Sequence, residues 1–407
     1  MTREVEVWID ADVAPSARVG MLHDDRGQIR FRYDRAWTHA SEAFQIDPGL
    51  SLDDAPFFPD PETGNFGIFL DSSPDRWGQT LMQRREALAA RDGKRRPRTL
   101  HAWDYLLGVQ DATRQGALRF RDPGSGRFLA DEALAAPPVT SLSELESVAR
   151  ELTGRRIDDL GRLRRWLAVL VAPGASLGGA RPKANFTERD GSLWIGKFPA
   201  HGDDRDTGAW EYLAHRLGLR AGIDVPDARL VRFSDFHTFC VRRFDRSGPQ
   251  RRFYASAMTM LGRERSEGTS YLELAQFLRL RGDPAHIDAD LEQLFRRVVF
   301  NVLVGNRDDH LRNHGFLLAE GGWRLAPAFD VNPNADKVEH VLDLDEGSSH
   351  PSIDAVHATH AFYGLDRARA ETIVSEIRAV VAGWRNEARR LRIAAADIDL
   401  MAAAFGA

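Results

Sequence analysis

The chain has 407 residues, of which 28% are charged and 43% hydrophobic, so its composition is that of an ordinary soluble protein with two or three domains. Its formal net charge of −5 argues against a protein that binds nucleic acid by itself, and its single cysteine, Cys240, excludes an intramolecular disulfide and an all-cysteine zinc site. No apolar run approaches the roughly 20 residues of a membrane span, and the charged segment 1–8 lacks the apolar stretch of a signal peptide, so we expect a cytoplasmic protein without membrane contact.

The N-terminal part of the sequence predicts short strands followed by a helix. Residues 5–10 and 28–33 alternate apolar and polar side chains, and the turn-forming segment 24–27 precedes the second run, which predicts antiparallel strands. Between residues 75 and 90 the apolar side chains recur at about one-turn spacing, which predicts a helix. We interpret the basic loop 91–98 that follows as a solvated connection, and the alternative is a patch for nucleic acid or an acidic partner.

A proline-rich segment at 135–140 is the best candidate for a linker. The Ser-Leu-Ser-Glu sequence at 141–144 follows it with the spacing of a capping box, which predicts the start of a helix. We therefore place a domain boundary here. The expected division is an N-terminal subdomain over 1–138, a smaller lobe over 139–246 and a mostly helical lobe over 247–407.

The two later segments differ in their predicted secondary structure. The smaller lobe predicts a glycine-rich turn and then strands around one helix, at 174–179, 193–198, 209–217, 228–233 and 238–244. The last segment predicts three helices and one hairpin, at 271–280, 291–305, 368–391 and 315–325.

The most informative stretch runs from 301 to 313, where an apolar helix ends at Gly305 and a polar loop begins. Asp308 and Asn313 are five residues apart, and the hairpin after them leads to Asp330. Phosphoryl transfer from ATP needs a carboxylate that orients and deprotonates the acceptor hydroxyl, and oxygen ligands that hold Mg²⁺ against the phosphates. Because the order matches the kinase catalytic and metal loops, we predict Asp308 as the base and Asn313 and Asp330 as magnesium ligands.

Each of these residues also has a structural interpretation. Asp309 directly follows Asp308, and either carboxylate could cap or brace the loop. Asn313 could hydrogen-bond to its own turn, and Asp330 could cap a following helix. The three residues in this order favour the catalytic interpretation more strongly than any one of them does.

Lys197 is a lysine among apolar neighbours in the predicted strand 193–198. A lysine in such a strand is costly to bury unless it is paired, so we expect a phosphate or carboxylate partner, and Glu211 on the next helix is the natural carboxylate. The loop between them contains three rival carboxylates, Asp203, Asp204 and Asp206. The alternative is an edge-strand lysine that points to water.

Two further segments could contact a nucleotide. The glycine-rich run 174–183 could lay backbone N–H groups along a phosphate chain, although it matches neither the Walker A pattern nor the glycine loop of ordinary protein kinases. Within 241–246 the backbone could read an adenine edge, and Asp245 could accept hydrogen bonds from ribose hydroxyls. The structural alternatives are a flexible turn for the first segment and a turn-forming aspartate for the second.

Together these motifs resemble those of the HipA-like (high-persistence) toxin kinases of bacterial type II toxin–antitoxin systems. The resemblance runs through most of the chain, and its markers are segments 73–78, 176–183, 194–199, 243–246, 305–313 and 327–330. It implies an α+β, bilobal protein-kinase-like fold with an extra N-terminal β-rich subdomain and a mostly helical C-terminal lobe. The segment 139–246 would then be the kinase N-lobe with the phosphate loop, and 247–407 the C-lobe with the catalytic and metal loops.

The resemblance implies an ATP-dependent serine/threonine protein kinase. In that family the position matching Asp308 is catalytic, and the positions matching Asn313 and Asp330 bind Mg²⁺. The residues that we assign to ATP are Lys197 at the phosphates, Asp245 at the ribose, and Arg243, Phe244, Ser176, Gly178, Gly179 and His310. The family's serine at the position of Ser176 is autophosphorylated, which ejects the loop and inactivates the enzyme. About two added negative charges where ATP phosphates bind would repel the nucleotide.

The resemblance also implies partners. The family's best-known target is glutamyl-tRNA synthetase, so we expect a protein substrate such as an aminoacyl-tRNA synthetase. The usual partner is a small helix-turn-helix antitoxin, HipB-like, which dimerises on operator DNA, so DNA contact would be indirect. Asp309 stands where the best-known members have glycine, and segment 254–262 lacks their Gln-Glu-Asp activation segment. Both differences bear on the protein substrate more than on phosphoryl transfer.

Three alternative functions follow from the same residues. The first is a catalytically silent corepressor that works with a DNA-binding antitoxin, which the complete set of predicted site residues argues against. The second is a kinase for a small molecule, since antibiotic kinases share the Asp-to-Asn catalytic loop. The third, and least supported, is a metal hydrolase that would use His310, His314, His357 and His360.

Overall fold

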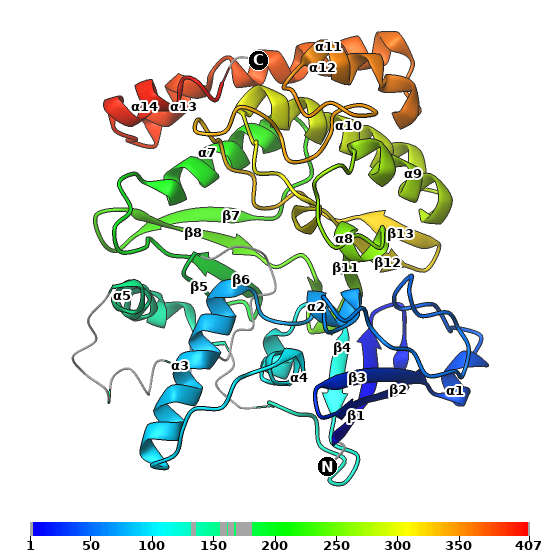
Figure 1. The fold of residues 1–407 in the computed structure, drawn as a ribbon. Helices are drawn as coiled ribbons and strands as arrows, with labels where there is room; N and C mark the ends of the chain where they lie inside the picture. Colours follow the sequence, from blue (N-terminus) through cyan, green and yellow to red (C-terminus); the bar gives the residue numbers. More distant parts are fainter. Residues whose placement is uncertain (1–2, 132–135, 155–160, 162–166, 168–180, 406–407) are drawn as a thin grey trace. The chain divides into compact units, whose positions relative to one another are not determined.

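The computed structural model describes residues 3–131, 136–154, 161, 167 and 181–405 (Figure 1). The backbone forms two compact units: unit 1 comprises residues 1–201 and 245–255, and unit 2 comprises 202–244 and 256–407. The chain therefore enters unit 2 and returns to unit 1 once before it finishes in unit 2. The division into three domains that we expect from the sequence stays a prediction.

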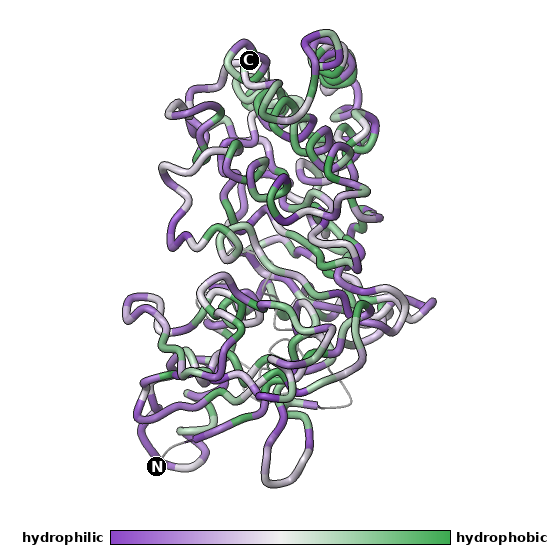
Figure 2. The backbone as a smooth tube through the Cα atoms, turned by 90° about the vertical axis from the view of Figure 1, so that its right-hand side faces the viewer, coloured by the Kyte–Doolittle hydropathy of each residue, from purple (hydrophilic) through white to green (hydrophobic). Residues whose placement is uncertain are grey.

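Unit 1 contains a four-stranded antiparallel sheet in the order β3-β2-β1-β4. Its strands are β1 (Arg3–Ala11), β2 (Ala14–Asp25), β3 (Gln28–Tyr33) and β4 (Leu118–Arg121). In β1 the alternate residues Val5, Val7 and Ile9 are buried, as the period-two pattern predicts. Figure 2 shows hydrophilic and hydrophobic stretches following each other along the whole tube. β2 and β4 were not predicted, because Pro15 and Gly20 interrupt the alternation in β2 and β4 is only four residues long.

The helices of unit 1 follow the first three strands of this sheet in the sequence. They are α1 (Arg35–Thr38), α2 (Gly67–Asp71), α3 (Arg76–Asp92), α4 (Ala102–Leu107) and α5 (Leu142–Thr153), with short 3-10 turns η1 (Asp111–Thr113) and η2 (Val139–Ser141). The predicted helix at 75–90 is confirmed as α3. A helix does begin after Ser141, but the predicted capping box is wrong: Ser141 lies in η2 with helical dihedrals, so its side chain makes no cap.

The remaining strands of unit 1 are short. β5 (Lys183–Thr187) and β6 (Leu193–Lys197) form an antiparallel hairpin, and β9 (Arg246–Ser247) pairs with β10 (Gln250–Arg251). β11 (Tyr254–Ser256) follows where the chain passes from unit 1 into unit 2. β6 confirms the predicted strand at 193–198. β5 was not predicted, because Lys183 and Asn185 are buried along with their apolar neighbours and the strand shows no alternation.

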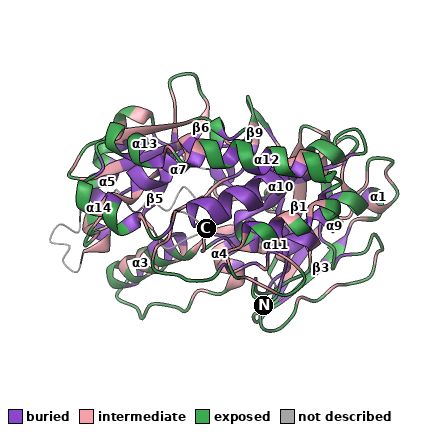
Figure 3. Ribbon diagram, turned by 90° about the horizontal axis from the view of Figure 1, so that it is seen from above, coloured by how far each residue is buried: buried purple, intermediate pink, exposed green. Residues whose placement is uncertain are grey.

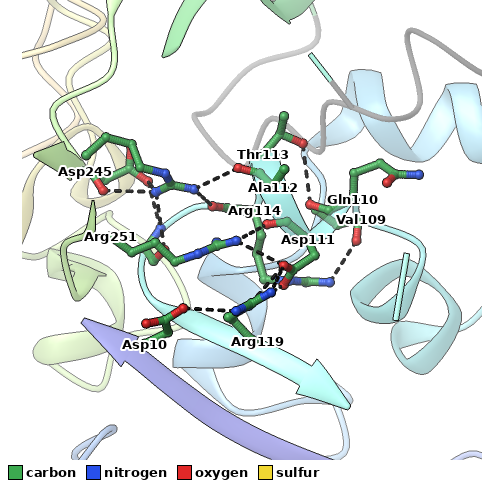
Figure 4. Close-up of polar contacts among 12 residues, drawn as sticks. Asp10, Val109, Gln110, Asp111, Ala112, Thr113, Arg114, Arg119, Asp245 and Arg251 are labelled. Atoms are coloured by element: carbon green, nitrogen blue, oxygen red, sulfur yellow. Dashed lines mark hydrogen bonds and ion pairs between the residues drawn. The ribbon is translucent and has the colours of Figure 1, made fainter. Parts of the chain in front are cut away.

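A buried arginine network connects the returning segment 245–255 with the N-terminal sheet inside unit 1 (Figure 4). Asp111 accepts hydrogen bonds from Arg119 at 2.6 Å and from Arg251 at 3.2 Å, and its backbone carbonyl accepts another from Arg251 at 2.7 Å. Arg119 also pairs with Asp10 at 3.0 Å. Because a buried charge is costly without a partner, these contacts fix where segment 245–255 runs.

Unit 2 is mostly helical, with two antiparallel strand pairs. Its strands are β7 (Ala228–Arg232), β8 (His237–Arg242), β12 (Gly315–Ala319) and β13 (Gly322–Leu325). Its helices are α7 (Thr207–Arg220), α8 (Ala257–Met260), α9 (Tyr271–Arg281), α10 (Ile287–Val304), α11 (Ile353–Ala358), α12 (Arg367–Val381), α13 (Trp384–Arg390) and α14 (Ala395–Met401), with 3-10 turns η3 (Leu311–Asn313) and η4 (His360–Tyr363).

The core of unit 2 is built around α10, which packs against α9, α11 and α12. Figure 3 shows α10 as a buried helix, whereas α9 and α12 have exposed faces. Every residue from Leu294 to Val304 is buried, including the polar Arg296, Arg297 and Asn301, so this part of the helix is covered on all sides. The predicted helices at 271–280 and 291–305 and the hairpin at 315–325 are confirmed.

The predicted helix at 368–391 is wrong in its length, because two helices occupy this range. α12 ends at Val381 and α13 begins at Trp384, with Ala382 and Gly383 between them. Both helices bury apolar residues, so the apolar spacing continues across the break and hides it. None of the helices within the described ranges combines the length and the hydropathy that crossing a membrane requires.

Candidate active site

The candidate active site in unit 2 begins where the buried helix α10 stops. Gly305 ends α10 with φ +65°, a left-handed conformation that favours glycine. A Cβ atom at this position would lie 2.3 Å from the backbone oxygen of Ala404, so no larger residue fits without movement. The start of the polar loop 306–314 is therefore fixed at Gly305, at the end of the buried helix α10.

Asp308 is the exposed carboxylate of this loop. Its side chain is 60% exposed and forms an ion pair with Lys337. A general base needs access to the hydroxyl that it deprotonates, and the exposure of Asp308 provides it. The role of Asp308 as the base stays a prediction.

Asn313 is buried in η3, only five residues after Asp308, and is 5% exposed. Its Nδ2 makes a long contact of 3.5 Å with the backbone oxygen of Asp308, whereas its Oδ1 is buried and accepts no hydrogen bond from any described residue. A buried amide oxygen without a donor is costly in a purely structural role. It fits a position that a cation occupies, because Mg²⁺ prefers oxygen ligands.

Asp330 lies in a segment without regular secondary structure after β13. Its φ is +58°, an uncommon conformation for a residue other than glycine, and its Oδ1 accepts a hydrogen bond from Asn332 at 3.2 Å. The next described helix, α11, begins only at Ile353, so the alternative that Asp330 caps a following helix is wrong. Non-glycine residues in this conformation cluster at functional sites.

Hydrogen bonds hold the segment 330–337 against the end of α10 and its loop. Asn332 donates its backbone N–H to Oδ1 of Asn306 at 3.1 Å. Asn334 donates its own N–H to the carbonyl of Gly305 at 2.9 Å. Arg307 donates to the carbonyl of Lys337 at 2.7 Å. The segments that carry Asp308 and Asp330 are therefore side by side, as their order in the sequence predicts.

Asp309 is the buried neighbour of Asp308, and it braces the loop. Its carboxylate accepts hydrogen bonds from the Tyr271 hydroxyl, from Asn301 Nδ2 at 2.9 Å and from the ring of His314 at 2.7 Å. Burial by itself would raise the pKa of Asp309, but the contacts with His314 and Tyr271 outweigh it and hold the pKa below its usual value. Of the two adjacent aspartates, Asp309 has the structural role that the sequence left open.

The histidines do not form a metal centre among the described residues. No group of three or more His, Cys, Asp or Glu side chains there is arranged to hold a metal ion. His357 and His360 contact each other at α11 and η4, with ring centroids 5.7 Å apart. The metal-hydrolase alternative therefore has no such group in this part of the chain. His310 is half-buried at the start of η3, and its assignment to ATP stays a prediction.

The predicted phosphate-binding residues belong to unit 1. Lys197 ends β6 and is half-buried, whereas Lys183, opposite it in the hairpin, is buried and forms an ion pair with Asp75 at 2.6 Å. Glu211, the predicted partner of Lys197, is buried in α7 of unit 2, and this pairing stays a prediction. Ser176, Gly178 and Gly179 lie outside the described residues.

The segment Arg243–Asp245 contains a second group of predicted nucleotide residues. Arg243 is buried, and the ring of Phe244 lies 5.3 Å from that of Phe329, centroid to centroid, next to Asp330. Asp245 is buried, and its Oδ2 accepts hydrogen bonds from the Gly116 amide and from Arg246, both at 2.8 Å. The structure thus gives Asp245 a bracing role, and its contact with ribose stays a prediction.

Comparison with known proteins identifies the family. A family model described as the HipA-like C-terminal domain matches residues 175–384, just over half of the chain, and one described as the HipA N-terminal domain matches residues 7–121. The chain belongs to the HipA-like family. The resemblance that the sequence motifs indicate is thereby confirmed.

Two curated relatives match part of this HipA-like chain. A putative kinase of Haemophilus influenzae is 30% identical over 136 residues, which are 30% of this chain and 39% of the relative. The serine/threonine-protein kinase toxin HipA of Shewanella oneidensis is 26% identical over 144 residues, which are 30% of this chain and 33% of the relative. The chain thus spans less than two fifths of the length of these relatives.

A solved structure supports the fold over nearly the whole chain. It is the complex of HipA, HipB and operator DNA from the toxin–antitoxin system of Shewanella oneidensis, with a TM-score of 0.68 and 17% identity. The match covers 98% of this chain and 94% of the matched chain. The expected α+β fold, with an N-terminal sheet and a mostly helical C-terminal part, is confirmed.

We predict that the two adjacent aspartates differ sharply in their effect on stability. Replacing Asp309 by Ala leaves Tyr271, Asn301 and His314 without their acceptor, and should lower the free energy of unfolding by about 3–5 kcal/mol. Asp308→Ala is the matched control and should stay within about 0.5 kcal/mol of the wild type, because Asp308 is exposed. Urea denaturation measures both, and equal losses would contradict the bracing role.

We also predict a pH-dependent stability that originates in His340. The residue is 5% exposed, and its ring nitrogens make no hydrogen bond of good geometry within the described residues. Burial lowers its pKa to about 4, although Asp309 and the backbone of Asn306 favour the protonated ring. The unfolded chain takes up a proton on this histidine below pH 6.5, whereas the folded chain does so only near pH 4. Stability should therefore fall between pH 6.5 and 4, by about 3 kcal/mol from this group. Urea denaturation at a series of pH values measures the free energy of unfolding, and His340→Phe should lose this part of its pH dependence. If the free energies of the variant and the wild type fall in parallel with pH, the prediction is wrong.

Proposed function

We propose that this HipA-like protein is an ATP-dependent serine/threonine protein kinase and the toxin of a type II toxin–antitoxin module. The observation that carries the proposal is the buried Oδ1 of Asn313, which has no hydrogen-bond donor in the described part of the chain, in the same loop as the exposed carboxylate of Asp308. A loop that buries an amide oxygen without a donor and exposes a carboxylate five residues away is suited to a cation and an acceptor hydroxyl.

In this proposal the residues of unit 2 have different roles in phosphoryl transfer. Asp308 orients the acceptor hydroxyl and takes its proton, while Asp309 holds the loop so that Asp308 faces outward. Asn313 and Asp330 would hold Mg²⁺, which supplies positive charge to the phosphates when bound. The hydrogen bonds between segment 330–337 and the end of α10 support this assignment, because they bring the two ligand-bearing segments together.

The nucleotide assignments extend the proposal to the rest of the chain. Lys197 would contact the phosphates, and the segment Arg243–Asp245, together with His310, would contact the nucleoside. The glycine-rich loop would cover the phosphates, with Gly178 and Gly179 close to them and Ser176 the site of inactivating autophosphorylation. The partners in this proposal are a HipB-like helix-turn-helix antitoxin, through which DNA is reached, and a cytoplasmic protein substrate such as an aminoacyl-tRNA synthetase.

We predict that Asp308→Asn lowers phosphoryl transfer by about 10²–10⁴-fold, the contribution expected of a general base. The purified chain is incubated with Mg²⁺, γ-labelled ATP and a proteome extract, and labelled proteins and metabolites are separated. Asp288→Asn, an exposed residue near the start of α10, is the control and should label like the wild type. A labelled protein band supports the proposal, whereas a labelled small molecule favours the small-molecule kinase and no label in the wild type favours the silent corepressor.

We predict that Ser176→Ala abolishes self-inactivation. The wild type incubated with ATP and Mg²⁺ should gain a phosphate and lose activity over time, because the phosphoserine repels the nucleotide phosphates. The Ser176→Ala variant should keep its activity and gain no phosphate by mass spectrometry. Unchanged phosphate incorporation in this variant would place the modification elsewhere.

A further inference from the structure

Unit 1 contains a cavity that the proposed catalytic function does not use. It lies between α3 and α4 and the loop that joins them, and its volume is about 270 Å³. Met82, Ala89, Leu100 and Leu107 give it apolar walls, and Trp103 also lines it. We call it the α3–α4 pocket.

The segment 84–98, which forms one side of the α3–α4 pocket, is strongly basic. It has seven basic and two acidic residues, a net charge of +5, on a chain whose net charge is −5. Among the described residues, no ion pair holds Arg91, Lys94 or Arg96, and all three are exposed. Their positive charge is therefore available to an anionic partner.

The two acidic residues in the lining are paired with arginines of the same segment, so the positive charge left for a partner is that of Arg91, Lys94 and Arg96. Glu86 accepts hydrogen bonds from Arg95 at 2.6 Å and from the backbone N–H of Arg98 at 2.9 Å. These contacts lower the pKa of Glu86 to about 2. Asp104 accepts from Arg98 at 3.0 Å and from Arg3 at 3.4 Å. The lining of the pocket thus combines apolar side chains with two paired acidic residues, and the exposed cations lie in the segment between two lining residues, Ala89 and Arg98.

We propose that the α3–α4 pocket binds an acidic polypeptide segment of a partner protein and receives one of its apolar side chains. The apolar side chains of the lining match the apolar part of such a segment, and the exposed cations Arg91, Lys94 and Arg96 match its acidic part. Single-stranded nucleic acid fits less well, because bases stack on open aromatic faces and Trp103, the aromatic residue in the lining, is only 5% exposed. This inference concerns unit 1 alone and holds whether or not the chain transfers phosphate.

The test uses the full chain and a fluorescein-labelled peptide, Glu-Asp-Glu-Leu-Phe-Glu-Asp-Glu, with anisotropy as the readout. The same peptide with Ser-Ser in place of Leu-Phe should bind about tenfold more weakly, because it has no apolar side chain for the pocket. Ala89→Trp, which fills the pocket from the exposed side of α3, should also weaken binding about tenfold. Ala87→Trp is the matched control, since Ala87 is exposed on the same helix outside the lining, and it should bind like the wild type.

A charge reversal tests the exposed cations separately. Arg96→Glu should weaken binding about threefold and reduce its dependence on salt, whereas Arg378→Glu on α12 of unit 2 should change neither. Circular dichroism checks that each variant is folded. Equal binding of the two peptides, equal binding by Ala89→Trp and the wild type, or preferential binding of a 20-base-pair DNA duplex would overturn the proposal.

Discussion

The buried carboxylate of Asp309 is the constraint on which the candidate active site depends. A charge that leaves water must be met by hydrogen bonds and opposite charge, and α9, α10 and the residue before β12 supply them through Tyr271, Asn301 and His314. The loop cannot shift without breaking one of these contacts. Since Asp309 occupies the buried position, its neighbour Asp308 remains outside, where a hydroxyl can reach it.

A second buried ion pair joins two distant segments of the chain, 73–78 and 176–183, at Asp75 and Lys183. Asp75 caps α3 by accepting the N–H of Gly78 at 2.8 Å, and its other oxygen pairs with Lys183. Trp77 donates its ring N–H to the carbonyl of the same lysine at 3.0 Å. The segment 73–78 therefore holds the first residue of β5, which ends the glycine-rich run assigned to the phosphates. Losing either charge would leave the other buried and unpaired.

The family and the fold are established for this chain, while its individual chemistry rests on particular side chains. Folds of one family can support different substrates or none, so activity has to be argued from the site. In unit 2 that argument rests on the amide oxygen of Asn313, for which the described residues offer no donor, and on the hydrogen bonds that join segment 330–337 to the end of α10. In unit 1 the basic segment beside the α3–α4 pocket points to an interaction that is independent of catalysis.

The sequence by itself determined the local helices and strands and the order in which the candidate site residues follow one another along the chain. The helices α3 and α10 and the hairpin β12–β13 could be predicted because periodic burial and turn residues lie within one short stretch. The spacing from Asp308 to Asn313 and the position of Asp330 were readable for the same reason.

Only the tertiary structure decided which polar groups are buried and what meets them. Asp309 rather than Asp308 braces the loop because residues 8 and 38 positions away in the chain bind it. Asp245 is buried because Gly116, 129 positions away, donates to it. Likewise β2 and β5 form strands through pairing with neighbours, not through their own alternation. Contacts between residues far apart in the chain leave no periodic signal, so spacing alone does not reveal them.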